Sequence, residues 1–156
     1  MTVETKANLS EKSIQNLQDL IQINIDSING LKDAAEGVND DRVENLFRDV
    51  LAERASFALE LQVYVEWNKE RAIVSQSLAG RVHQLWMDVR SKLNGGDPYV
   101  ILIEAERGED SIKAAYEHAL SDNPASAVGD VLHQQLTIVK SGHDRIRDMR
   151  DLYAKK

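Results

Sequence analysis

Residues 94–124 read NGGDPYVILIEAERGEDSIKAAYEHALSDNP and contain the signals of one complete helix. Asp97 followed by Pro98 is typical of a helix start, because the carboxylate caps a free backbone N–H and proline suits the first helical position. Asn123 followed by Pro124 shows the same pattern of a capping residue and a proline, and predicts the start of a further helix. Between the two signals, an apolar stripe at steps of three and four predicts an amphipathic helix over 98–121 that one acid, Glu109, interrupts.

The same pattern recurs along the rest of the chain. It predicts helices over about 10–36, 40–66, 76–93 and 124–153, with Ser10 capping the first and Asn39 or Asp40 capping the second. Gly37 marks the end of the first helix, and Gly95-Gly96 is interpreted as a hinge between helices. No segment shows the alternation of a strand, so the pattern predicts an all-α fold.

The lengths and connections of these helices indicate a bundle. Short turns join 10–36 to 40–66 and 98–121 to 124–153, so each pair is expected to form an antiparallel hairpin. The helix over 76–93 is long enough to climb roughly 25 Å and return the chain along most of the bundle. We therefore predict a ferritin-like four-helix bundle with an additional crossover helix, in one domain over residues 1–156 whose residues 1–9 are flexible.

Composition excludes several classes of protein. The 156 residues include no cysteine, which excludes disulfides, thiolate zinc sites and cysteine nucleophiles. A formal net charge of −7 argues against nucleic-acid binding as the main role. The apolar runs are too short to span a membrane, and the polar first ten residues carry no secretory signal, so we expect a cytoplasmic protein.

Four of the predicted apolar stripes are each interrupted once near the middle by a strongly polar residue. These residues are Asn24, Arg54, Glu109 and Gln135. Counted from the helix ends, all four fall within one turn of the same height, which predicts a single buried polar layer. Because burying an unpaired charge is costly, we expect Arg54 and Glu109 to form an ion pair, with Asn24 and Gln135 satisfying its remaining groups. In the alternative arrangement, Arg54 extends outward and Glu53 turns inward.

Four segments carry a family resemblance. They are LAERASFALELQ (51–62), GRVHQLWMD (80–88), EAERGED (104–110) and GHDRIRDMRD (142–151). Together they resemble an uncharacterised ferritin-like four-helix-bundle family of proteobacteria, a domain of unknown function, with similarity over about 17–151. The resemblance supports the fold and implies no activity of its own.

The wider ferritin and rubrerythrin superfamily uses di-iron chemistry, with a Glu on each of two helices and Glu-x-x-His on the other two. This chain departs from that pattern. Arg54 and Phe57 stand where one Glu-x-x-His belongs, Gln135 and Ile138 stand where the other does, and Asn24 replaces a helical Glu. Only Glu109 keeps the superfamily's residue type. The resemblance therefore implies that other side chains, among them Arg54, take the place of the two irons.

A metal site in another register stays open as an alternative. Its candidate ligands are Glu53, Glu60, Glu106, Glu109 and His143, and such oxygen-rich ligands favour iron or manganese. Asp130-x-x-His133 is expected to be an exposed pair on the side of its helix.

The first functional hypothesis is a non-enzymatic structural or interaction module, without cofactor and associated with stress as its relatives suggest. We expect a homodimer with Trp67 or Trp86 at the interface, and an unknown protein partner. The second hypothesis is an iron or manganese oxidase, peroxide scavenger or iron-handling protein. The third is a small-ligand binder whose pocket is the bundle centre. Nothing indicates a Ser-His-Asp triad or a phosphate-binding glycine loop.

Overall fold

The computed structural model describes residues 4–68, 78–93 and 96–155. Over these residues the chain forms five helices and no strand, with one isolated β-bridge between Thr5 and Asn8, so the all-α prediction is confirmed. The helices are α1 (Glu11–Gly37), α2 (Asp41–Trp67), α3 (Leu78–Ser91), α4 (Pro98–Asp122) and α5 (Gly129–Ala154).

Three helices begin at the residues that the capping pattern predicts. In each case the side chain before the helix accepts a hydrogen bond from a backbone N–H of the first turn. The three caps are Ser10 to Ser13, Asp40 to Val43, and Asp97 to Tyr99. Of the two candidates for capping α2, Asn39 and Asp40, the cap is Asp40. Its carboxylate also accepts a hydrogen bond from the Tyr153 hydroxyl. Of the expected hinge, Gly95 lies outside the described residues, and Gly96 has a φ of 72°.

The predicted start of the last helix at 124 is wrong. Asn123 ends α4, with its backbone N–H bonded to Ala119 O, and α5 begins only at Gly129. The Asn123 amide donates to Ser13 Oγ on α1 at 2.9 Å and does not cap a following helix. A tertiary hydrogen bond thus replaces the local capping that the sequence pattern suggested.

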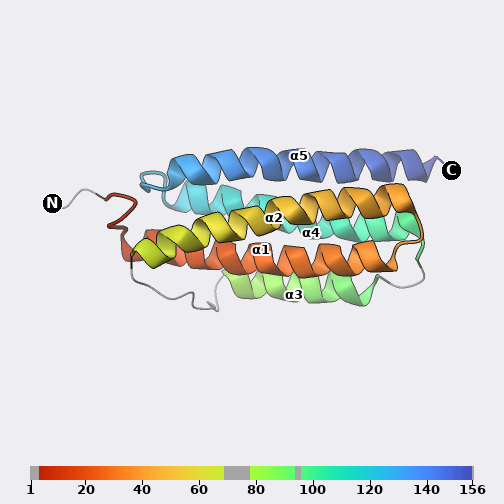
Figure 1. Ribbon diagram of the computed structural model, residues 1–156, viewed down its shortest axis with the longest axis horizontal. Helices are drawn as coiled ribbons and strands as arrows, with labels where there is room; N and C mark the ends of the chain where they lie inside the picture. Colours follow the sequence, from red (N-terminus) through yellow and green to blue (C-terminus); the bar gives the residue numbers. More distant parts are fainter. Residues whose placement is uncertain (1–3, 69–77, 94–95, 156) are drawn as a thin grey trace.

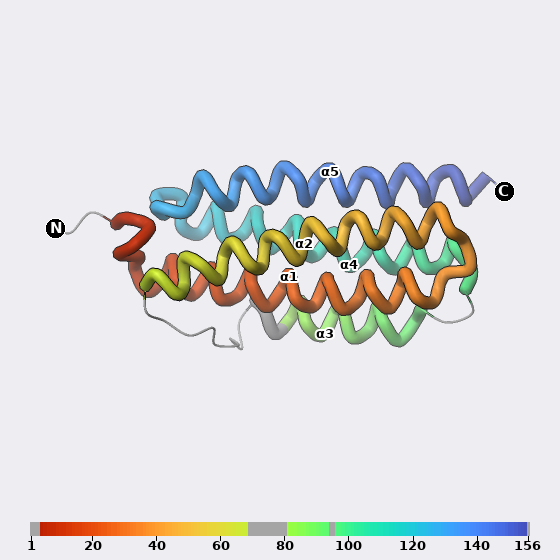
Figure 2. The backbone as a smooth tube through the Cα atoms, viewed as in Figure 1, coloured from red at the N-terminus to blue at the C-terminus, as the bar shows by residue number. Residues whose placement is uncertain are grey.

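The helices are arranged as two antiparallel hairpins with α3 between them in the chain (Figure 1). The pair α1 and α2 and the pair α4 and α5 each pack closely, while α1 also contacts α4 and α2 contacts α5. Helix α3 runs along the outside of this group against α1 and α4 (Figure 2). The apolar stripes of all five helices supply the core, which includes Leu17, Phe47, Ile112 and Val139.

The two tryptophans differ in their surroundings. Trp86 of α3 is only 1% exposed, so its predicted place at an exposed interface is wrong, whereas Trp67 at the end of α2 is 57% exposed. A Cβ built on Gly30 of α1 or on Gly108 of α4 would lie 2.1 or 2.4 Å from the Trp86 ring. These two glycines therefore make the space in which the indole fixes α3 to the bundle.

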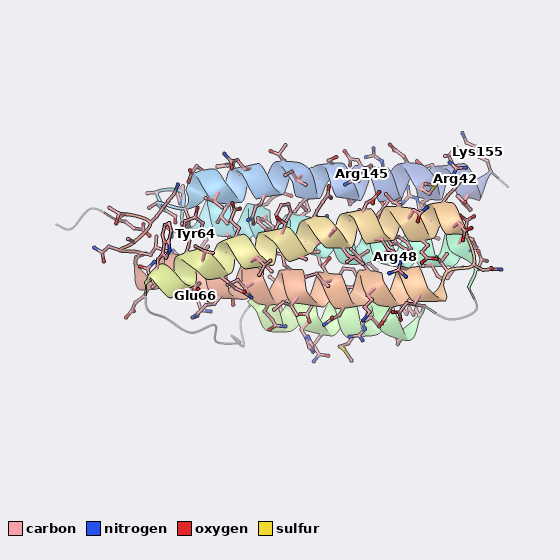
Figure 3. All side chains as sticks on the ribbon, in the orientation of Figure 1. Arg42, Arg48, Tyr64, Glu66, Arg145 and Lys155 are labelled. Atoms are coloured by element: carbon pink, nitrogen blue, oxygen red, sulfur yellow. The ribbon has the colours of Figure 1, made fainter. Side chains whose placement is uncertain are left out.

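The N-terminal segment contacts the end of α2. Asn68, just after α2, accepts a hydrogen bond from the Leu9 N–H at 2.8 Å and donates one to Lys6 O at 3.0 Å. Leu9 is 8% exposed, so within the described residues 4–9 at least this side chain is packed against the core. Figure 3 shows Tyr64 at this end of α2.

None of the helices in the described part of the chain combines the length and the apolar character that crossing a membrane requires.

Candidate functional site

The four polar residues singled out in the apolar stripes are all buried. Asn24 of α1, Arg54 of α2 and Glu109 of α4 are 0% exposed, and Gln135 of α5 is 2% exposed. Each of the four helices around the bundle centre therefore contributes at least one polar side chain to its interior. Because a buried polar group without a partner is costly, the contacts of these side chains determine what the site can do.

Arg54 and Glu109 form an ion pair inside the bundle. Arg54 Nε donates to Glu109 Oε2 at 3.4 Å, and Nη2 lies 3.3 Å from Oε1. The guanidinium also lies over the Phe57 ring, 5.7 Å from its centroid. Arg54 is the inward residue of its helix, while Glu53 remains partly exposed and pairs with Arg145 at 2.6 Å. Figure 3 shows Arg145 on α5.

The hydrogen bonding of this pair is incomplete. Arg54 Nη1 and Nη2 and Glu109 Oε1 make no hydrogen bond with the described residues. Burial raises the pKa of the Glu109 carboxyl above its ordinary value, and the Arg54 guanidinium beside it opposes that rise. The Arg54 cation therefore favours the charged form of a carboxyl whose burial favours the neutral form.

Asn24 and Gln135 meet at a tyrosine and do not bond to the ion pair, so that part of the prediction is wrong. Asn24 Nδ2 donates to the Tyr116 hydroxyl at 2.9 Å and to Leu20 O at 2.8 Å. The same hydroxyl donates to Gln135 Oε1 at 2.6 Å, and Gln135 Nε2 donates to Glu60 at 2.7 Å. A chain of hydrogen bonds thus runs from α1 through the core to the edge of α2.

The polar residues occupy two levels of the bundle. Tyr116 follows Glu109 by seven residues, which places it about two turns farther along α4. We name the Arg54–Glu109 pair the ionic level and the Asn24–Tyr116–Gln135–Glu60 chain the tyrosine level. Tyr116 lies within the apolar stripe predicted over 98–121, seven residues after Glu109. Because a buried tyrosine hydroxyl needs a partner, this spacing was the signal available in the sequence.

Replacing Tyr116 with phenylalanine tests the tyrosine level. The change removes the hydroxyl that accepts from the buried Asn24 amide and donates to the buried Gln135 carbonyl. The free energy of unfolding should therefore fall by about 1–3 kcal/mol. Urea denaturation measures this loss. Tyr99→Phe, at an exposed position on the same helix, is the matched control and should change stability by less than about 0.5 kcal/mol. Equal effects of the two substitutions would contradict a structural role for the Tyr116 hydroxyl.

The carboxylates proposed for an alternative metal site are only partly brought together. Glu53 pairs with Arg145 and also lies 4.0 Å from Arg54 Nη1, Glu60 accepts a hydrogen bond from Gln135, and Glu109 pairs with Arg54. Among the described residues, the group whose ligand atoms all lie within 4.8 Å of one another consists of Glu106, Asp110 and His143. Of the other histidines, His133 is exposed and His83 contacts Asp26 at 2.8 Å.

A cavity lies between α1, α3 and α4. Its volume is about 260 Å³, and it is lined by Lys12, Gln15, Asn16, Asp19, Leu20, Arg81, His118, Ala119 and Asp122. The small-ligand hypothesis placed its pocket at the bundle centre. In the structure, the bundle centre is occupied by the buried side chains of the ionic level and the tyrosine level.

Comparison with known proteins gives one family. A family model described as a domain of unknown function (DUF2383) matches residues 12–122, which is more than half of the chain. The expected resemblance reached residue 151, whereas this match ends with α4 and leaves α5 outside. No curated protein and no solved structure matches the chain.

Proposed function

Because the chain belongs to the DUF2383 family, a domain of unknown function, we propose its role from the site itself. The chain acts as a structural or interaction module without enzymatic activity. Its arrangement is ferritin-like, and an Arg–Glu polar layer replaces the di-iron site. One observation carries this proposal: the Arg54 guanidinium is 0% exposed and pairs with a Glu109 side chain that is equally buried.

The helix arrangement supports the ferritin-like part of the proposal. Two antiparallel hairpins, α1 with α2 and α4 with α5, are joined by a segment that contains α3 and crosses from one hairpin to the other (Figure 1). Ferritin-like bundles use one long crossover of this kind between two hairpins.

The residues present do not fit a di-iron centre. Such a centre takes four carboxylates and two histidines from the four core helices. Here the side chains that interrupt the four apolar stripes are an amide on α1 (Asn24), a guanidinium on α2 (Arg54), a carboxylate on α4 (Glu109) and an amide on α5 (Gln135). The cation of Arg54 would repel a metal ion beside Glu109, and the only carboxylate of the set is already paired with it.

Assembly and location belong to the same proposal. The exposed apolar residues Leu59, Val63 and Trp67 follow one another at helical spacing on α2 and offer a face for a homodimer or another protein partner. The cytoplasmic location and the association with stress derive from the sequence and the resemblance alone.

An iron or manganese pair bridged by carboxylates is the competing proposal, with oxidase, peroxide-scavenging or iron-handling activity. Glu53, Glu60 and Glu109 would be its ligands. Their bonds to Arg145, Gln135 and Arg54 make this proposal the weaker of the two, because each partner would have to be displaced before a metal ion could be shared.

Metal analysis after aerobic loading with Fe(II) separates the two proposals. The full chain is incubated with Fe(II) and passed over gel filtration, which also reports its assembly, and its iron is then counted by plasma mass spectrometry. We expect no pair of irons per chain, because the Arg54 guanidinium occupies the centre. Retention of two irons that Glu109→Gln abolishes, while the exposed Glu117→Gln control does not, would overturn the structural proposal.

A further inference from the structure

His143 of α5 faces two carboxylates of α4. Its Nε2 lies 2.6 Å from Asp110 Oδ1 and 3.7 Å from Glu106 Oε1. Glu106 and Asp110 are four residues apart, so they share one face of their helix. The three side chains therefore bring one imidazole nitrogen and two carboxylate oxygens to one point between α4 and α5.

The imidazole nitrogen of this cluster is buried and lacks a hydrogen bond. The His143 side chain is only 10% exposed, and its Nε2 has no hydrogen-bond partner among the described residues, since the close contact with Asp110 lacks hydrogen-bond geometry. On the other side of the ring, Nδ1 lies 3.0 Å from Asp144 Oδ1. A carboxylate at Nδ1 holds the proton there and leaves the Nε2 lone pair free to bind a cation.

The two carboxylates differ in a way that suits a metal site. Glu106 turns Oε1 toward His143 and bonds through Oε2 to Arg150, which fixes its orientation. The Asp110 side chain is 61% exposed, so the cluster is open to solvent on that side. Water can therefore deliver a cation and complete its coordination.

We propose that His143 Nε2, Asp110 Oδ1 and Glu106 Oε1 bind a single first-row divalent cation such as Zn²⁺. Bonds of about 2.0–2.2 Å to such an ion separate neighbouring ligand atoms by roughly 3.0–3.5 Å. The observed 2.6 and 3.7 Å lie on either side of this range, and the three ligand atoms all lie within 4.8 Å of one another, so side-chain rotations can bring them to one ion. The imidazole ligand favours a first-row transition metal over Mg²⁺ or Ca²⁺.

This site shares no ligand with the ionic level and does not depend on the proposed function. The simpler arrangement with the same residues is a protonated His143 paired with Asp110 and Glu106, with no affinity for metal ions. The two arrangements make opposite predictions for a titration with Zn²⁺, because a protonated imidazole cannot act as a ligand.

Calorimetric titration of the metal-free full chain with Zn²⁺ distinguishes them. We expect one ion per chain, and a loss of affinity of about 10–100-fold in Asp144→Asn, which removes only the carboxylate behind the ring. His143→Gln should lose at least as much. His133→Gln, which changes an exposed histidine of the same helix, should leave the affinity unchanged. Co²⁺ should give a visible absorption band that disappears in His143→Gln.

Absence of Zn²⁺ binding would overturn the proposal, and so would binding that is equally strong in His143→Gln. If the buried His143 proves necessary for folding, Asp110→Asn tests the same site, because its side chain is largely in solvent. Unchanged affinity in a folded Asp110→Asn variant would also overturn it. Failure here differs from failure of the proposed function, which would show two irons per chain that depend on Glu109.

Discussion

Replacing Arg54 with methionine is expected to lower the free energy of unfolding at about pH 8 by about 3–5 kcal/mol. The substitution keeps an unbranched side chain of similar length but removes the cation that faces Glu109. A carboxylate that is 0% exposed then has no partner of opposite charge. Urea denaturation monitored by circular dichroism measures the loss.

The pH dependence of this variant identifies the stranded carboxylate as the cause. Burial raises the pKa of Glu109 above its ordinary value of 4.5, and without Arg54 that pKa rises further. The folded state then binds the proton more tightly than the unfolded state. Stability is therefore greatest below the ordinary pKa and falls as the pH rises toward the raised one. The destabilisation by Arg54→Met should accordingly shrink as the pH is lowered from 8 toward 5.

A double substitution separates loss of the pair from loss of Arg54 itself. When Glu109 is also replaced by methionine, no unpaired charge is left at the ionic level, and the stability should return to within about 1 kcal/mol of the unmodified protein or exceed it. Arg48→Met is the matched control, because Arg48 is on the surface of the same helix and pairs with Glu44 one turn away (Figure 3). It should cost less than about 1 kcal/mol. A similarly small loss in Arg54→Met would refute the buried ion pair.

The helices were predictable because their signals are local. Ser10, Asp40 and Asp97 each cap the helix that follows, and the side chain and the amide it satisfies lie within three residues of each other. The interruption of each apolar stripe was visible for the same reason, since helical periodicity places residues on a face without reference to the rest of the fold. Local spacing therefore sufficed for the fold class and for the inward direction of Arg54 and Glu109.

Contacts that depend on the reach of a side chain between helices were not predictable in this way. Tyr116 places its hydroxyl well away from its own backbone, so it meets Asn24 and Gln135 at a level that residue counting did not indicate. Asn123 bonds to Ser13 on another helix and so does not cap α5. Asp110 joins His143 only because α4 and α5 pack in one particular register.

Gly108→Ala is expected to lower the free energy of unfolding by about 1–3 kcal/mol, even though alanine is the better helix former. The new Cβ would lie 2.4 Å from the Trp86 ring. The ring has no room to move away, because Gly30 of α1 packs against it so closely that a Cβ built on Gly30 would lie 2.1 Å from the ring. The clash must therefore displace α3. Gly129→Ala, where a Cβ meets nothing within 4 Å, is the matched control and should cause no loss.

The effect of Gly108→Ala should change sign when the indole is removed. Trp86→Ala alone should cost about 3–5 kcal/mol, because it empties the largest fully buried side-chain position of the core. In that background the alanine at 108 meets no ring, and only its helix propensity remains, which adds up to about 1 kcal/mol of stability. Urea denaturation of the unmodified protein, the two single variants and the double variant measures this coupling. If Gly108→Ala cost the same with and without Trp86, contact with the indole would not be the reason for glycine at 108, and α3 would have to be held on α4 by other residues.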